Sequence, residues 1–194
     1  MELSLYEFLV ESDEEGLSLK VKTLVEGKGI ILYQPPQRIT PIYEIIKGAI
    51  RIGSYSSNGG EICYDILKPG DFFGNLQYLN GQFSEFAKTL TPVSLRLYEQ
   101  PFFKKVTNHI PEVSEWFSVK LVKRWCQAEE RLFAVRSLDP KENVQRVLKQ
   151  FQESIEDGDG KKQILTDLIT LQDIADLTGL TRQTVSNVIK GVLA

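Results

Sequence analysis

Residues 170–190 read TLQDIADLTGLTRQTVSNVIK, a stretch with the spacing of two short helices joined by a tight turn. Thr170 is a favourable N-cap residue, and Asp173 stands three residues later, at the capping-box position. Gly179 stands where the chain must turn sharply, and glycine adopts the positive φ of such a turn without steric cost. Thr181 follows as the cap of the second helix. The pattern predicts a helix-turn-helix.

The second of these helices has an apolar face and a polar face. Val185, Val188 and Ile189 would pack on the first helix, which leaves an arginine and two amides pointing outward. Such side chains can bond two atoms of one base edge, so we expect this helix to contact DNA. The residues expected at base edges are Arg182, Gln183, Ser186 and Asn187, and those expected at phosphates are Thr170, Thr181, Thr184 and Lys190. The alternative is a helical hairpin that serves only as structure.

The chain just before this motif is also expected to be helical. Asp139-Pro140 is typical of a helix start, and an apolar face follows from Val144 to Phe151. The acidic and glycine-rich run at residues 156–160 breaks the pattern. We expect residues 137–194 to form one compact helical domain.

A long helix is expected from about Pro111 to Val135, because that stretch holds no glycine and no internal proline. Its apolar residues recur at steps of three and four, and a second apolar set that includes Trp116 and Phe133 lies beside them. We expect one face to pack on the rest of the chain and the other on a partner helix in a dimer. The alternative is a helix buried within a single chain. The residues expected at the dimer seam are Val113, Phe117, Leu121, Trp125, Ala128 and Leu132.

Residues from about 20 to 100 have the pattern of short antiparallel strands. Apolar runs alternate with turn residues at intervals of about ten. Residues 56–60, SSNGG, are a hairpin connection, and residues 93–98 alternate strictly between apolar and polar. The fold class predicted for the whole chain is therefore α+β, with a β-roll of the jelly-roll kind, a long helix and a helix-turn-helix. The domain boundaries predicted are 1–108, 109–136 and 137–194.

The composition excludes several classes of protein. The 194 residues carry a net charge of −3, and no apolar run is long enough to span a membrane. The first ten residues lack the basic start of a signal peptide, so we expect a cytoplasmic protein. Cys63, Cys126 and His109 match no metal-binding spacing, and no catalytic motif occurs. We expect two buried thiols, a surface imidazole in a loop that runs into the long helix, no metal, no cofactor and no enzyme activity.

The order of these parts resembles the Crp/Fnr superfamily of bacterial regulators over nearly the whole chain. Residues 45–52, IIKGAIRI, look like the strand around a Lys-Gly pair in that family. Residues 67–74, LKPGDFFG, look like the approach to its phosphate-binding cassette, and residues 180–186, LTRQTVS, are similar to its recognition helix. The resemblance implies a cyclic-nucleotide-binding-like β-roll, a dimerisation helix and a winged helix-turn-helix. It also implies double-stranded DNA, a second copy of the chain, RNA polymerase and a small effector as partners.

The chain departs from the family pattern where the family binds cyclic nucleotides. The cassette glycine is followed by Asn75-Leu76 in place of Glu, and residues 82–86, QFSEF, lack the arginine that meets the cyclic phosphate. The nucleotide-contacting hydroxyls of the family's long helix fall near Ala128 and Glu129. Cyclic AMP is therefore not the expected effector. The residues expected around an effector are Phe73, Gly74, Asn75, Leu76, Ser84, Glu85, Ala128 and Glu129.

Two further features bear on DNA binding. The sequence ends at Ala194, soon after the second helix, so the β-hairpin wing of the family is expected to be missing. Residues 140–194 hold seven Lys or Arg against eight Asp or Glu, so affinity for DNA must come from the placement of charge. These features support a rival interpretation, a ligand-binding or protein-interaction dimer with a vestigial helix-turn-helix. Gln and Asn at 183 and 187 favour adenine, which predicts half-sites richer in A·T than the family's common one.

Overall fold

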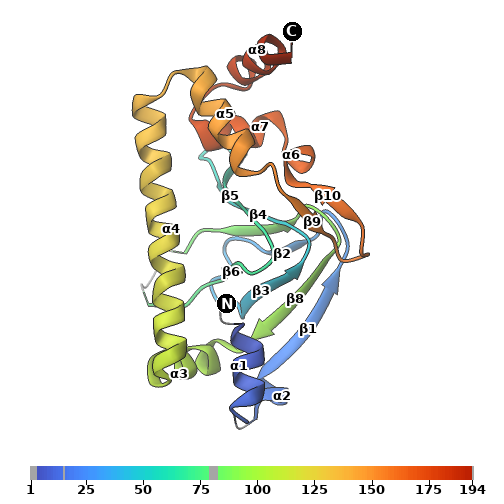
Figure 1. The fold of residues 1–194 in the computed structure, drawn as a ribbon, viewed down its shortest axis with the longest axis vertical. Helices are drawn as coiled ribbons and strands as arrows, with labels where there is room; N and C mark the ends of the chain where they lie inside the picture. Colours follow the sequence, from blue (N-terminus) through green and yellow to red (C-terminus); the bar gives the residue numbers. More distant parts are fainter. Residues whose placement is uncertain (1–3, 15, 79–82, 194) are drawn as a thin grey trace.

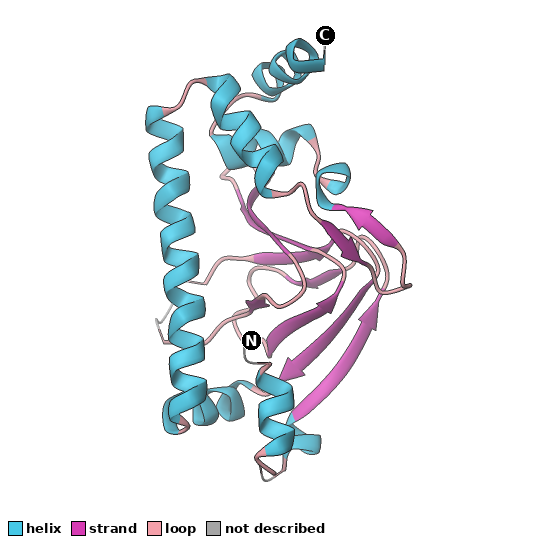
Figure 2. Cartoon of the chain, in the orientation of Figure 1, coloured by secondary structure: helices cyan, strands magenta, loops and turns pink. Residues whose placement is uncertain are grey.

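The computed structural model describes residues 4–14, 16–78 and 83–193. A β-roll of two antiparallel sheets occupies the centre, a long helix runs along one side of it, and a group of helices lies at one end (Figure 1). The distribution of helix and strand confirms the predicted α+β class (Figure 2).

Each sheet of the roll has four strands. The first has the order β1-β8-β3-β6 and the second has the order β2-β7-β4-β5, with every pairing antiparallel. The predicted connection at residues 56–60 is the turn between β4 and β5, closed by the Ser56 N–H donating to Gly60 O at 2.8 Å. The strands are β1 Val21–Glu26, β2 Ile31–Tyr33, β3 Ile42–Lys47, β4 Ile50–Tyr55, β5 Glu61–Leu67, β6 Phe72–Phe73, β7 Phe86–Thr89 and β8 Val93–Tyr98.

The interior of the roll, between the two sheets, is filled by apolar and aromatic side chains. Tyr33, Tyr43 and Phe73 are buried there, and the rings of Tyr43 and Phe73 stack with centroids 4.8 Å apart. Phe83 packs against Tyr33 at 5.6 Å between centroids. Burial of these four rings supplies much of the apolar area that holds the sheets together.

Helices that were not predicted pack against Ile42 and Tyr98 of the first sheet. α1 (Leu5–Glu11), α2 (Leu17–Lys20) and α3 (Gln100–His109) lie at the end of the roll that carries the N-terminus (Figure 1). Residues 107–109 were expected to form a loop, but they are the last turn of α3, because Phe102, Phe103 and Val106 bury one face of that helix. His109 is exposed, as predicted, but it lies on a helix.

The long helix α4 extends from Pro111 to Ser137, close to its predicted bounds. At a rise of about 1.5 Å per residue its 27 residues extend for about 40 Å. α5 (Pro140–Gln150) follows and begins as predicted, with the Asp139 side chain accepting from the Glu142 N–H at 2.9 Å.

The C-terminal domain contains a β-hairpin that the sequence analysis missed. β9 (Ser154–Glu156) pairs with β10 (Lys162–Ile164), and residues 156–160, expected only to break a helical pattern, form the end of β9 and most of the turn that follows it. α6 (Leu165–Leu168), α7 (Leu171–Thr178) and α8 (Arg182–Leu193) follow. Within residues 4–14, 16–78 and 83–193, no strand comes after α8.

The C-terminal domain shares one apolar core with the roll. Ala49, Cys63 and Ile66 of the roll are buried together with residues of the C-terminal helices. The Cys63 N–H donates to Asp176 Oδ2 of α7 at 2.8 Å, and the Gly158 N–H donates to Pro92 O at 2.8 Å. The C-terminal helices and hairpin are thus held in place by packing against the roll and by hydrogen bonds to β5 and to Pro92, just before β8. The C-terminal members of the core are Val144, Val147, Phe151, Ile155, Leu165, Ile174, Ala175, Leu177 and Val185.

Candidate DNA-contacting helix and ligand cavity

α7 and α8 form the predicted pair of helices. The Thr170 side chain accepts from the Asp173 N–H, and Asp173 accepts from the Thr170 N–H at 2.9 Å, which is a complete capping box. Gly179 has φ +68°, and a Cβ there would lie 3.1 Å from Val135 Cγ1 of α4. The Thr181 hydroxyl accepts from the Thr184 N–H at 3.1 Å and caps α8.

α8 turns its polar face away from the rest of the chain. Val185 is fully buried against α7, whereas Arg182, Gln183 and Asn187 are exposed. The helix lies at the end of the molecule farthest from α1 and α3 (Figure 1). Gln183 Nε2 donates to Asn187 Oδ1 at 2.9 Å, so the two amides are held side by side. Of the other predicted contacts, Thr170, Thr181 and Lys190 are exposed, and Thr184 and Ser186 are half-buried.

The exposed face of α4 is strongly apolar. Every residue from Leu121 to Glu130 is exposed, and the Trp125 side chain, at 67 %, is the most exposed of the large apolar ones on this helix. A face of this kind on a single chain marks an interaction surface. The exposed apolar residues of α4, here called the α4 stripe, are Val119, Leu121, Val122, Trp125, Leu132, Phe133 and Val135.

The predicted dimer seam agrees with the α4 stripe only in part. Leu121, Trp125 and Leu132 belong to the stripe, and Ala128 is exposed near them. Val113 was wrongly placed in the seam, because it is fully buried in the chain's own core with α3. Phe117 is half-buried, and its ring packs edge-on against Phe103 with centroids 5.3 Å apart. The first two turns of α4 therefore face the chain's own interior.

The middle of α4 contacts the roll through long cationic side chains. Lys120 donates to Gly70 O at 3.2 Å, and Arg124 donates to Phe72 O at 3.2 Å. Two helical turns after Arg124, Arg131 Nη2 lies 3.1 Å from Asp65 Oδ1 and forms an ion pair with it. In this part of α4, the contact with the roll is made by cationic side chains of the helix that donate hydrogen bonds to backbone carbonyls of the roll.

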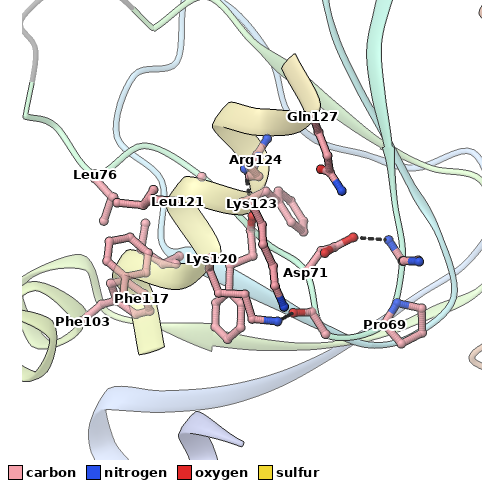
Figure 3. Close-up of a pocket in the computed structure, with 16 residues that line it drawn as sticks. Pro69, Asp71, Leu76, Phe103, Phe117, Lys120, Leu121, Lys123, Arg124 and Gln127 are labelled. Atoms are coloured by element: carbon pink, nitrogen blue, oxygen red, sulfur yellow. Dashed lines mark hydrogen bonds between the residues drawn. The ribbon is translucent and has the colours of Figure 1, made fainter. Parts of the chain in front are cut away.

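A cavity of about 370 Å³ lies beside these contacts, between α4 and residues 68–76 (Figure 3). Its wall combines apolar side chains such as Phe72 and Leu121 with four cationic ones. The cationic residues are Lys68, Lys120, Lys123 and Arg124. Burial raises the pKa of Asp71, the one carboxylate among the described lining residues, although the Lys68 N–H and charge lower it.

Only three of the predicted effector residues line this cavity: Phe73, Gly74 and Leu76. The sequence analysis missed the cationic residues of α4, although Lys120, Lys123, Arg124 and Gln127 have the i, i+3, i+4, i+7 spacing of one helix face. This spacing in the sequence could have indicated that the four polar side chains share one face of the helix.

The other predicted effector residues lie outside the cavity. The Asn75 N–H donates to Thr40 Oγ1 at 2.8 Å, and Ser84 Oγ lies 3.4 Å from Ser54 Oγ. Glu85 accepts a hydrogen bond from Tyr33 inside the roll, and burial raises the pKa of both groups. Ala128 and Glu129 are exposed on α4, where Trp125 Nε1 donates to Glu129 Oε1 at 2.6 Å. These residues are spread over the roll and the exposed face of α4, and they do not line the cavity beside Gly74. Gln82 lies outside the described residues.

The described part of the chain holds no group of three or more His, Cys, Asp or Glu side chains placed to bind a metal ion. Cys63 is buried, as expected, but Cys126 is exposed on α4, so the expectation of two buried thiols was half wrong. No helix among the described residues is both long and apolar enough to cross a membrane.

Comparison with known proteins agrees with a β-roll followed by a long helix and a helix-turn-helix. Residues 27–109 match the family described as cyclic nucleotide-binding domain. A CRP-like cAMP-activated global transcriptional regulator of Mycobacterium tuberculosis is 27% identical over 146 residues, 75% of this chain and 65% of that protein. The global nitrogen regulator of Synechococcus elongatus is 29% identical over 131 residues, 66% of this chain and 58% of that protein. The matches thus span less than two thirds of either relative. The first is named as a transcriptional regulator and the second as a nitrogen regulator, and neither name is that of an enzyme.

Solved structures share the fold. FixK2 from Bradyrhizobium japonicum has a TM-score of 0.71 at 19% identity, covering 89% of this chain and 84% of its own. A Crp/Fnr-family transcriptional regulator from Thermus thermophilus has a TM-score of 0.67 at 23% identity, covering 89% and 86%. The matched nucleotide-binding domain, the named relatives and the shared fold agree with the resemblance to the Crp/Fnr superfamily carried by residues 45–52, 67–74 and 180–186, and the chain is similar to regulators of that superfamily.

Proposed function

We propose that the chain is a transcription regulator that binds double-stranded DNA as a homodimer. The observation that carries the proposal is the outward face of α8, where Arg182, Gln183 and Asn187 are exposed while Val185 anchors the helix from behind. An arginine beside paired amides suits the donor and acceptor pattern of base edges in the major groove. Contact with RNA polymerase, implied by the family resemblance, and a location in the cytoplasm are part of this proposal.

The α4 stripe supports the homodimer. Two copies of α4 paired through Leu121, Trp125 and Leu132 would bury the exposed apolar area about a two-fold axis. The same axis would place two copies of α8 in successive major grooves, about 34 Å apart. We expect sedimentation to give twice the mass of the chain, and Trp125→Glu to shift it toward the monomer. The control is Glu115→Gln, an exposed change on α4 outside the stripe, and it should remain a dimer.

We propose further that cyclic AMP is not the effector. Support comes from the cassette, where Asn75 replaces the expected glutamate and no arginine stands within residues 83–89 to meet a cyclic phosphate. The four aromatic rings inside the roll support the same conclusion, because they occupy space that a nucleotide would need. Cyclic AMP should therefore leave both the melting temperature and the DNA affinity unchanged.

A salt titration of binding to labelled genomic fragments tests the proposal. A protein that neutralises phosphates releases counterions, so the logarithm of the binding constant should fall steeply with the logarithm of salt concentration. Arg182→Ala should weaken binding to a preferred fragment by about 1–3 kcal/mol and reduce the preference between fragments. Arg136→Ala, which removes an exposed arginine near the end of α4, is the control. Weak binding with no salt dependence would favour the rival, a dimer with a vestigial helix-turn-helix.

A further inference from the structure

The outward side of α8 carries a single ridge of polar side chains. Gln183, Asn187 and Lys190 have the i, i+4, i+7 spacing of one helix face, and all three are exposed. Val185, which is fully buried, stands on the opposite side of the helix. Arg182 is also exposed, but it lies about 100° from Gln183 around the helix axis. The ridge is therefore the part of α8 that projects farthest from the rest of the chain.

The two amides of this ridge are joined by a hydrogen bond, in which Gln183 Nε2 donates to Asn187 Oδ1 at 2.9 Å. An amide group carries two N–H donors and a carbonyl oxygen that can accept two hydrogen bonds. A bond between the two groups therefore leaves each of them with a donor and an acceptor for another partner. An adenine edge needs both, an acceptor for N6 and a donor for N7. The bonded pair can thus still contact two adenines.

The same bond sets the distance and the orientation of the two amides. The 2.9 Å between Nε2 and Oδ1 is close to the rise of about 3.4 Å between successive base pairs of DNA. The terminal torsion of a Gln or Asn side chain is broad and roughly two-fold, so an isolated amide presents its oxygen and nitrogen in either order. In the pair, the Gln183 nitrogen points toward Asn187. Amides that are already oriented lose less entropy when they contact a base.

We propose that Gln183 and Asn187 recognise two successive A·T base pairs as one unit, in which each amide holds the other in its base-contacting orientation. Two independent contacts would each select one base pair, whatever happened to the neighbouring side chain. In the paired arrangement, loss of either amide relaxes the selection at both base pairs. Recognition of the bases rests on the function proposed above, but the hydrogen bond between the amides does not.

Nuclear magnetic resonance of the 15N-labelled chain tests the hydrogen bond without DNA. The side-chain NH2 group of Gln183 should have a higher order parameter than that of Gln145, an exposed glutamine of α5. Asn187→Ala removes the acceptor and should lower the Gln183 value to that of Gln145. Asn187→Asp keeps an acceptor oxygen and should preserve the Gln183 value. Equal order parameters for the two glutamines in the unaltered chain would overturn the proposal.

Affinity for fluorescein-labelled duplexes tests the recognition of bases. The probes are the inverted repeat selected by the unaltered chain and two derivatives, in which one or the other A·T pair of each half-site is replaced by G·C. On the selected repeat, Gln183→Ala and Asn187→Ala should each weaken binding at least about tenfold, and the double variant should lose little more. Arg182→Ala combined with Asn187→Ala should instead lose the product of the two single losses. Gln145→Ala is the control and should bind every probe as the unaltered chain does.

The two derivatives separate a paired unit from two independent contacts. Asn187→Ala should reduce the preference for A·T at both base pairs, whereas Asn187→Asp, which keeps Gln183 oriented, should reduce it at one. A loss of preference at one base pair only in Asn187→Ala would overturn the proposal, and so would a Gln183→Ala, Asn187→Ala variant that loses the product of the single losses. Failure of the proposed function would give a different result, because the unaltered chain itself would then prefer no duplex over another. That result would overturn the recognition of bases but would leave the resonance measurement unaffected.

Discussion

Arg51 of β4 and Asp173 of α7 form a buried ion pair, with 2.5 Å between Nε and Oδ1, that joins the β-roll to the helix-turn-helix. The two side chains are 11% and 2% exposed. Arg51 also contacts Glu61 of β5, and Asp173 closes the capping box with Thr170. One carboxylate therefore fixes both the start of α7 and its position on the roll.

Replacing Arg51 by Met should lower the free energy of unfolding by about 3 kcal/mol, because Asp173 would remain buried without its counter-charge. Lys20→Met is the control, since the Lys20–Glu99 pair is 45% and 46% exposed and should contribute about 1 kcal/mol or less. Urea unfolding followed by circular dichroism measures both. Equal small losses in the two variants would show that the buried pair does not hold the domains together.

Gly158 makes the closest approach between the β9–β10 turn and the roll. A Cβ at this position would lie 2.8 Å from Val93 N and 2.9 Å from Pro92 C, and backbone atoms cannot move aside cheaply. Gly158→Ala should therefore cost about 1–3 kcal/mol and speed proteolytic cleavage between the two domains. Gly27→Ala, where nothing lies within 4 Å, should leave both measurements unchanged. A Gly158→Ala variant that melts and is cleaved like the unaltered chain would contradict the packing described.

The local features of the C-terminal domain could be read from the sequence because each depends on neighbouring residues. Asp139 caps α5, Thr170 and Asp173 form the capping box, and Gly179 adopts a positive φ, all as predicted. Caps and turns are satisfied within four residues, so local spacing is sufficient to find them.

Features that join distant parts of the chain could not be predicted in this way. Arg51 and Asp173 are 122 residues apart in the sequence, and no local sequence pattern around either residue predicts that the two form an ion pair. Val113 fits the apolar repeat of α4, but the position of α3 buries it. The cavity needs the turn after β5 and one face of α4 together; of its lining residues on α4, Phe117 and Leu121 were assigned to the dimer seam and the others to no site.

The two cysteines should differ sharply in reactivity. Burial and the charge of Asp173 raise the pKa of the Cys63 thiol to about 12, although Arg51 opposes them, so Cys63 carries almost no thiolate at pH 8. Cys126 is exposed. Iodoacetamide at pH 8 should modify Cys126 alone in the folded chain and both cysteines in denaturant, as mass spectrometry of the peptides can show. Rapid modification of folded Cys63 would mean that the shared core is open.

The central claim, that a two-fold pair of α8 helices reads DNA, is tested most directly by selection of binding sites from random duplexes with the unaltered chain. The expected product is an inverted repeat whose half-sites lie about one helical turn apart, 34–36 Å, with A·T pairs opposite Gln183 and Asn187. The Arg182→Ala variant should select a less defined half-site. If the selection returned the family's common half-site unchanged, the prediction that Gln183 and Asn187 favour adenine would be refuted. Selection that enriches no sequence over the starting pool would contradict the account as a whole.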